Sequence, residues 1–171
     1  MSDADIEDIE ACALAGRRPR DAGPYRIQVG DAHFEFQSVI APGPVLTGRA
    51  LRELAALTPP HDHLCLALQT DGLLEEVRLD ETIDLRAGIE KFFAFKNDRF
   101  YRFLLDGREY QWGGAFVTGA MLLKLAKLDP ATHTVTQRLP EGGERTVGPA
   151  ALVDLGEAGV EDFVTKAVAS A

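Results

Sequence analysis

The residues of this chain most able to do chemistry stand together in the stretch PPHDHLCL, which contains His61, His63 and Cys65. Imidazole and thiolate groups are ligands that zinc prefers, and the alternating spacing would place the three side chains on one face of a strand. A zinc site needs three or four converging ligands, however, and the second half of the chain offers only His133 at the corresponding turn. We therefore expect a solvated loop before a strand, with Cys65 as a small buried residue and no metal or other cofactor. A small metal-dependent enzyme is the alternative that these residues leave open.

No other stretch carries a catalytic motif. The sequence APGPV at 41–45 is a proline-stiffened loop and not a glycine-rich phosphate loop after a strand. No order of serine, histidine and acid matches a known hydrolase motif. We therefore predict that the protein is not an enzyme.

The chain is acidic throughout its length. Its 171 residues carry a net charge of −9, and residues 1–23, 24–97 and 98–171 each hold more acidic than basic side chains. A protein that follows phosphate backbones needs a basic surface, so we expect no nucleic-acid binding. No apolar run reaches the roughly 18 residues of a membrane span, and the N-terminus lacks the apolar core of a signal peptide. These features predict a cytoplasmic protein without a membrane partner.

Residues 1–23 are too polar to fold alone and are predicted to form a flexible acidic leader. Ile6, Ile9 and Leu14 have near-helical spacing, which leaves a docking helix as the alternative.

The remainder of the chain consists of two segments with similar sequences. The stretch LTGRALRELAAL (46–57) corresponds to VTGAMLLKLAKL (117–128), and the stretches before and after it correspond as well. YRIQVGDAHFEF (25–36) matches YRFLLDGREYQW (101–112), and both alternate apolar and polar residues around a turn, as β-hairpins do. IDLRAGIEKF (83–92) matches VDLGEAGVEDF (153–163). Three matched blocks in one order indicate a tandem duplication with a period of roughly 71 to 76 residues.

Each copy reads as a small domain of its own, 24–97 and 98–171, joined by a very short linker at 96–98. The order of elements is hairpin, helix, two strands, the Asp-Leu block and a last strand. A helix packed across one face of a mixed sheet buries the apolar faces of both, so we predict an α+β protein of two tandem β-grasp domains. Periodicity alone would also permit another small α+β fold.

The two helices have the same start and the same apolar stripe. Thr47 and Thr118 are predicted to cap them, with Gly48 and Gly119 tolerated in the first turn. The stripes predicted to face the core are Ala50, Leu51, Leu54 and Leu57 in one copy and Met121, Leu122, Leu125 and Leu128 in the other.

These blocks, from about residue 24 to the end, resemble the bacterial multiubiquitin family, whose members join ubiquitin-like domains in tandem. The resemblance implies a protein modifier in a conjugation system linked to antiphage defence. It also implies an adenylating activating enzyme, a conjugating enzyme, a JAB-type metallopeptidase and a target protein as partners.

A modifier of this kind supplies a C-terminal carboxylate in place of a catalytic side chain. The resemblance therefore places the conjugation tail at Val168, Ala169, Ser170 and Ala171, whose small side chains suit a narrow adenylation channel. The tail departs from ubiquitin because it lacks a terminal Gly-Gly, and a metallopeptidase would be able to trim it before activation. The alternative is a non-covalent adaptor in which the tandem domains present binding faces and the tail stays free.

Overall fold

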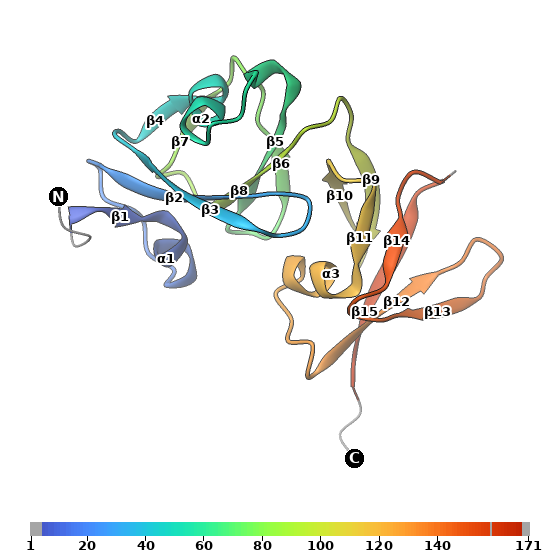
Figure 1. The fold of residues 1–171 in the computed structure, drawn as a ribbon. Coiled ribbons are helices and arrows are strands. Elements are labelled where there is room, and N and C mark those ends of the chain that lie inside the picture. Colours follow the sequence, from blue (N-terminus) through green and yellow to red (C-terminus); the bar gives the residue numbers. More distant parts are fainter. Residues whose placement is uncertain (1–4, 158, 169–171) are drawn as a thin grey trace. The chain divides into compact units, whose positions relative to one another are not determined.

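The computed structural model describes residues 5–157 and 159–168, which divide into two compact units (Figure 1). The division falls between Arg99 and Phe100, two residues after the predicted boundary.

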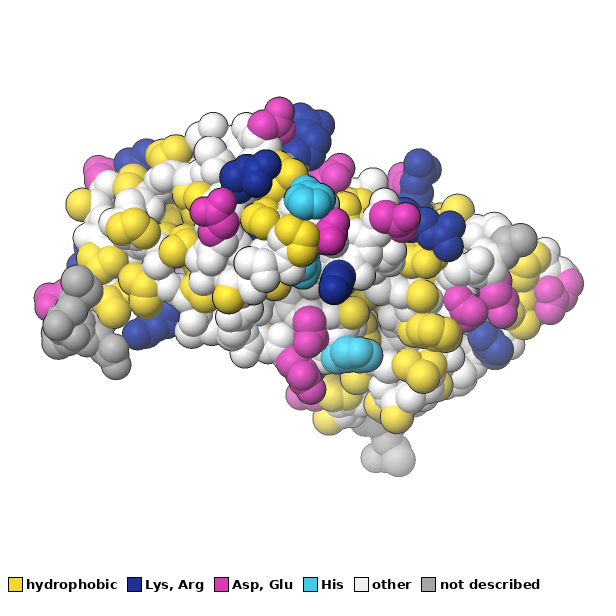
Figure 2. Space-filling view, turned by 45° about the horizontal axis from the view of Figure 1, so that its top comes forward, with side chains coloured by type: hydrophobic (Ala, Val, Ile, Leu, Met, Phe, Trp, Pro, Cys, Tyr) yellow, Lys and Arg dark blue, Asp and Glu magenta, His cyan; other side chains and the backbone are white. Residues whose placement is uncertain are grey.

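None of the three α-helices among the described residues has the length and apolar character that a membrane crossing requires. Basic and acidic side chains are interspersed on the face shown in Figure 2.

The first unit is built on a six-stranded mixed sheet. The strand order is β3-β2-β8-β5-β6, and the short β1 also pairs with the start of β2, at Tyr25 and Arg26. β4 and β7 form a separate ribbon. Its central strand, β8, runs parallel to β2 and antiparallel to β5. The elements are β1 (Glu7–Asp8), α1 (Ile9–Leu14), β2 (Tyr25–Gly30), β3 (Phe36–Ala41), β4 (Val45–Thr47), α2 (Gly48–Leu54), the 3-10 helix η2 (Pro60–Asp62), β5 (Leu64–Gln69), β6 (Leu74–Glu76), β7 (Thr82–Asp84) and β8 (Ile89–Phe95).

The second unit repeats this arrangement. The strand order β10-β9-β15-β12-β13 has the same topology as β3-β2-β8-β5-β6, and β11 pairs with β14 as β4 pairs with β7. The elements are β9 (Tyr101–Leu105), β10 (Arg108–Trp112), β11 (Phe116–Thr118), α3 (Gly119–Leu125), β12 (His133–Arg138), β13 (Glu144–Val147), β14 (Leu152–Asp154) and β15 (Glu161–Ala167). The predicted pair of α+β units is confirmed, with α2 and α3 as the equivalent helices and α1 as an additional helix of the first unit.

The hairpin of the first unit differs from its prediction. The predicted returning strand ended at residue 36, whereas β3 begins at Phe36 and pairs with β2 through Ala41. Residues 31–35 form a longer turn, in which Phe34 has a positive φ of 59°. In the second unit the tight Asp106-Gly107 turn keeps the hairpin within the predicted 101–112.

The helix starts follow the predicted caps, but the glycines have a stronger role than tolerance. Thr47 Oγ1 accepts from the N–H of Ala50 at 3.0 Å, and Thr118 Oγ1 accepts from the N–H of Met121 at 3.1 Å. A Cβ at Gly48 would lie 1.9 Å from the carbonyl oxygen of Arg78, and one at Gly119 would lie 2.5 Å from that of Gly148. No side chain fits there, so the Thr-Gly pair marks a close approach of the helix to a neighbouring loop.

The predicted apolar stripe of α2 is only partly the buried face. Leu51 is fully buried, but Leu54 is 37% exposed, and Arg52 is buried instead. The Arg52 guanidinium donates to the main-chain carbonyls of Gly48, Val77 and His63 at 2.8, 2.8 and 3.0 Å. A buried charged side chain is tolerated when its donors are satisfied in this way. The equivalent residue of α3 is Leu123, which is buried together with the predicted Met121, Leu122 and Leu125.

The prediction of a flexible leader is wrong for its described residues, 5–23. β1 pairs in parallel with β2, and α1 follows with the carboxylate of Asp8 as its cap. Ile9 is fully buried in the core of the first unit, although Leu14 is 69% exposed. The leader is too polar to form a core of its own, but an existing sheet supplies the apolar surface that a short helix lacks.

We expect Gly119→Ala to destabilise the second unit by about 1–3 kcal/mol, because its methyl group must displace main-chain oxygens. Gly143→Ala is the matched control, since its Cβ would meet only Leu139 Cδ1 at 3.7 Å. Trp112 is the single tryptophan and is buried in this unit, so its fluorescence during urea unfolding reports the change. Equal unfolding midpoints for the two variants would contradict the close approach.

Candidate functional site

The histidines and cysteine that suggested a metal site face different neighbours. His61 lies in η2 and contacts Asp62 at 3.4 Å, while His63 Nδ1 lies 3.1 Å from the carbonyl oxygen of Pro59. Cys65 points into the core, where burial raises the pKa of its thiol to about 11. A thiol that stays protonated at neutral pH is a poor metal ligand. Within residues 5–157 and 159–168, no group of three or more His, Cys, Asp or Glu residues is arranged to hold a metal ion.

The predicted conjugation tail begins at the end of the central strand of the second unit. β15 pairs in parallel with β9 on one side and antiparallel with β12 on the other. The N–H of Val168 then donates to the carbonyl oxygen of Thr132 at 2.7 Å, and its side chain is 48% exposed. Ala169, Ser170 and Ala171 lie outside the described residues. The ladder therefore holds the chain up to Val168.

Side chains fasten β15 in addition to its main-chain ladder. The Asp106 carboxylate, in the β9–β10 turn, accepts from the N–H of Thr165 at 2.8 Å and from its hydroxyl at 2.7 Å. Lys166 Nζ donates to Glu144 at 2.8 Å, and this contact lowers the pKa of the Glu144 carboxyl. His133 is opposite Ala167, with its Nδ1 2.8 Å from Thr132 Oγ1. This arrangement fixes the end of β15 by side-chain as well as main-chain hydrogen bonds.

The corresponding strand of the first unit, β8, leads into the second unit and not to a chain end. β8 ends at Phe95, and the chain continues into β9 at Tyr101. The last strand of the first unit is thus committed to the chain, and only β15 leads to residues 168–171.

Comparison with known families agrees with the duplication. The family described as Multiubiquitin matches this chain twice, at residues 25–97 and at residues 101–167. The chain belongs to the multiubiquitin family. Its two units are therefore tandem ubiquitin-like domains, and multiubiquitin is a family of ubiquitin-like domains and not an enzyme class. A search of curated proteins found no match to the chain.

The docked leader of this multiubiquitin protein precedes the first matched segment, and the sequence predicts a docking helix there only as the alternative to a flexible leader. Glu7 organises it: its side chain is 9% exposed and accepts from the Arg17 guanidinium at 3.2 and 3.3 Å and from the N–H of Arg20 at 2.9 Å. The Arg17 hydrogen bonds are the main reason that the pKa of the Glu7 carboxyl is lowered. The spacing of one glutamate before two arginines carries no recognisable motif, so nothing in the sequence indicated this cluster.

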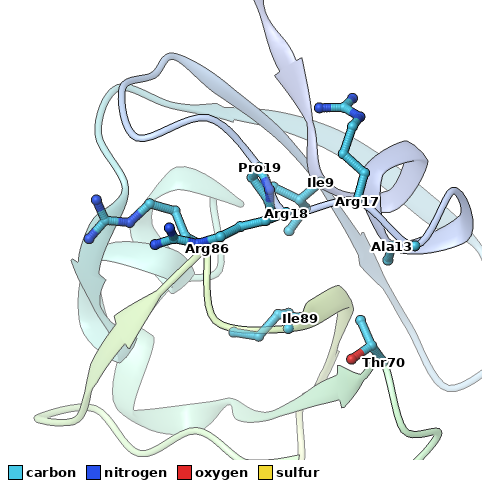
Figure 3. A pocket seen from close by; sticks show the side chains of 10 residues that line it. Ile9, Ala13, Arg17, Arg18, Pro19, Thr70, Arg86 and Ile89 are labelled. Atoms are coloured by element: carbon cyan, nitrogen blue, oxygen red, sulfur yellow. The ribbon is translucent and has the colours of Figure 1, made fainter.

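Residues of the leader and of the body of the first unit together line a cavity of about 360 Å³ (Figure 3). Ile9 and Ala13 line one side of it, and Ile89 and Thr70 line the other. Arg86 also lines the cavity, and its guanidinium is bound by Asp84 at 2.9 and 3.0 Å, which lowers the pKa of that carboxyl to about 2. Arg86 also contacts the leader, because its guanidinium lies 3.9 Å from the Asp21 carboxylate and donates to the main-chain carbonyl of Asp21 at 3.5 Å.

The Glu7 cluster makes leader docking sensitive to acid. The carboxylate has a lower pKa folded than its ordinary value of 4.5, so its stabilisation is complete above that pH and is lost as the pH falls through the folded pKa. We expect Glu7→Gln to reduce the hydrogen-exchange protection of α1 roughly tenfold at pH 6.5. The variant should also lack the further loss of α1 protection that we expect for the unmodified protein as the pH falls below 4.5. The exposed Glu53→Gln is the control, and equal protection of α1 in both variants would contradict the role of Glu7.

Proposed function

We propose that this protein is a ubiquitin-like modifier that is attached to target proteins through the carboxylate after β15. The observation that carries the proposal is the position of β15 as the fully paired central strand of a ubiquitin-like unit. A strand held in this way and followed by small residues would suit an enzyme that must reach a carboxylate beyond the folded unit. Val168, Ala169, Ser170 and Ala171 have side chains small enough for a narrow channel.

The proposed reaction needs no catalytic side chain from this protein. The carboxylate attacks the α-phosphate of ATP on an activating enzyme, releasing pyrophosphate and forming an acyl-adenylate. A thiol of the activating enzyme then displaces AMP, and a thiol of a conjugating enzyme takes over the acyl group and releases the first thiol. An amine of the target finally displaces that thiol and forms an amide bond. A terminal alanine adds one methyl group beside the reacting carbon compared with glycine, which is a modest steric demand.

The proposed setting is a bacterial cytoplasmic defence system with a JAB-type metallopeptidase that trims or removes the modifier. These partners follow from the resemblance to the family, and the chain itself contributes the two units and the tail. The first unit has no carboxylate of its own to activate, because β8 continues into the second unit. One chain would therefore add two ubiquitin-like units to a target in one step.

A non-covalent adaptor is the second candidate, and one observation favours it. Val45 of the β4–β7 ribbon is 50% exposed, and Phe116, at the equivalent position of the β11–β14 ribbon, is 48% exposed. An exposed apolar side chain repeated at the same place in both units would suit a partner that binds each unit in the same way.

The test is intact mass spectrometry of the protein mixed with its cognate activating and conjugating enzymes and ATP. We expect an ATP-dependent covalent adduct for the full chain and none for a variant lacking residues 169–171. That variant keeps Val168 and its hydrogen bond to Thr132, so the fold is preserved. Val45→Asp is the matched control and should form the adduct normally. If active enzymes form no adduct with the full chain or with trimmed forms of it, the adaptor is favoured.

A further inference from the structure

The two units correspond residue by residue around the loop that joins the hairpin to the ribbon. The last residue of the hairpin is Ala41 in the first unit and Trp112 in the second, and each lies opposite the tyrosine that begins the hairpin. A loop of equal length then leads into the ribbon in each unit. In both units the N–H of the leucine after the second ribbon strand donates to the carbonyl oxygen before the first, at 2.8 Å to Pro44 and at 2.7 Å to Ala115. Ala41 and Trp112 are therefore equivalent.

Large side chains fill the region beside the helix in the second unit, and alanines stand there in the first. Trp112 is fully buried, and Met121, in the first turn of α3, is 8% exposed. The residues equivalent to them are Ala41 and Ala50. A small side chain in place of a large one leaves a space unless the surroundings close over it.

That space is an open groove in the first unit. The groove has a volume of about 490 Å³ and lies between α2 and the loop from β3 to β4 (Figure 1). Its walls are mainly apolar, with Val45 on the side of the loop and Leu54 on the side of the helix. Leu54 is 37% exposed, whereas the equivalent Leu125 is 3% exposed. The first unit thus keeps an apolar groove at the place that the second unit fills with its own side chains.

One carboxylate lines this groove. Glu53 is exposed, and its side chain makes no hydrogen bond or ion pair within residues 5–157 and 159–168. The equivalent residue of α3 is Lys124, so the charge at this position is opposite in the two units. A carboxylate beside apolar walls complements a ligand that combines an apolar group with a cation.

We propose that this groove binds a segment of a partner protein in which a tryptophan stands next to a lysine or arginine. The indole occupies the space that Trp112 and Met121 take in the second unit, and the basic side chain pairs with Glu53. A large aromatic side chain in a pocket is a common anchor of protein interfaces. The second unit fills this place itself, so docking of this kind belongs to the first unit. The inference rests on the comparison of the two units and does not require conjugation.

The test uses the capped peptide Ac-Gly-Trp-Lys-Gly-NH₂ and a second peptide with glutamate in place of the lysine. Each is titrated into the ¹⁵N-labelled full chain, and the amide shifts of Ala50, Glu53 and Leu54 give the affinity. We expect the lysine peptide to bind about two- to five-fold more tightly, which is the range of an exposed ion pair. A third peptide, with alanine in place of the tryptophan, should cause no shifts.

Two substitutions give the first unit the residues of the second. Ala50→Met should fill the groove and abolish the shifts with every peptide, and methionine is a good helix former at this half-buried position. Glu53→Lys should invert the preference and make the glutamate peptide the tighter one. Phe116→Ala is the control: it removes an exposed apolar side chain from the ribbon of the second unit and should leave both affinities unchanged.

Three results would overturn the inference. The first is that no peptide shifts the groove amides at millimolar concentration. The second is that the lysine and glutamate peptides bind the unmodified chain equally, or that Ala50→Met binds as tightly as the unmodified chain. The third is that a rising concentration of the full chain alone shifts the same amides and that Phe116→Ala removes those shifts, because the occupant would then be the second unit of another copy.

Discussion

Each unit depends on one contact of its helix, α2 or α3. The start of that helix contacts the loop before the second strand of the ribbon, which is β7 in the first unit and β14 in the second. A helix start leaves main-chain N–H groups without partners inside the helix. In α2 the N–H groups of Gly48 and Arg49 donate to the carbonyl oxygens of Glu81 and Leu79, both at 2.9 Å, and in α3 that of Ala120 donates to Pro149 at 3.1 Å. The absence of a side chain at Gly48 and Gly119 permits this approach. The contact fixes the helix beside the ribbon and, through it, the turn that leads into the last strand.

The two units share this contact but differ in the residues and segments around it. Arg52 ties α2 to three carbonyls, whereas the equivalent Leu123 packs as an ordinary apolar residue. The first unit has also acquired a leader, which contacts the body through the ion pairs of Glu10 with Lys91 and of Asp21 with Arg86. The second unit carries the strand that leads to the tail. The duplication thus separates a unit that carries additional structure from a unit that presents the chain end.

The sequence predicted well the elements that the two units share, and poorly the features that only the first unit has. The Thr-Gly pairs, the apolar alternation of the hairpins and the repeated Asp-Leu block are local signals, so caps, strands and topology followed from them. Arg52 could not be predicted as buried, because its stability there depends on carbonyls of residues far along the chain, at His63 and Val77. The docked leader was only the alternative prediction for the same reason, since Ile9 is buried only by a sheet that forms elsewhere. The metal hypothesis rested on spacing in an extended strand, which η2 interrupts.

The central claim is that the chain joins targets through the residues after β15, and a tryptic digest of purified conjugates tests it most directly. Trypsin cleaves after Lys166, so each modified residue of the target should carry a remnant that begins with Ala167. Tandem mass spectrometry of the branched peptides would show that remnant joined by an amide bond to a target lysine. Conjugates whose branched peptides contain any other segment of this protein would contradict the claim.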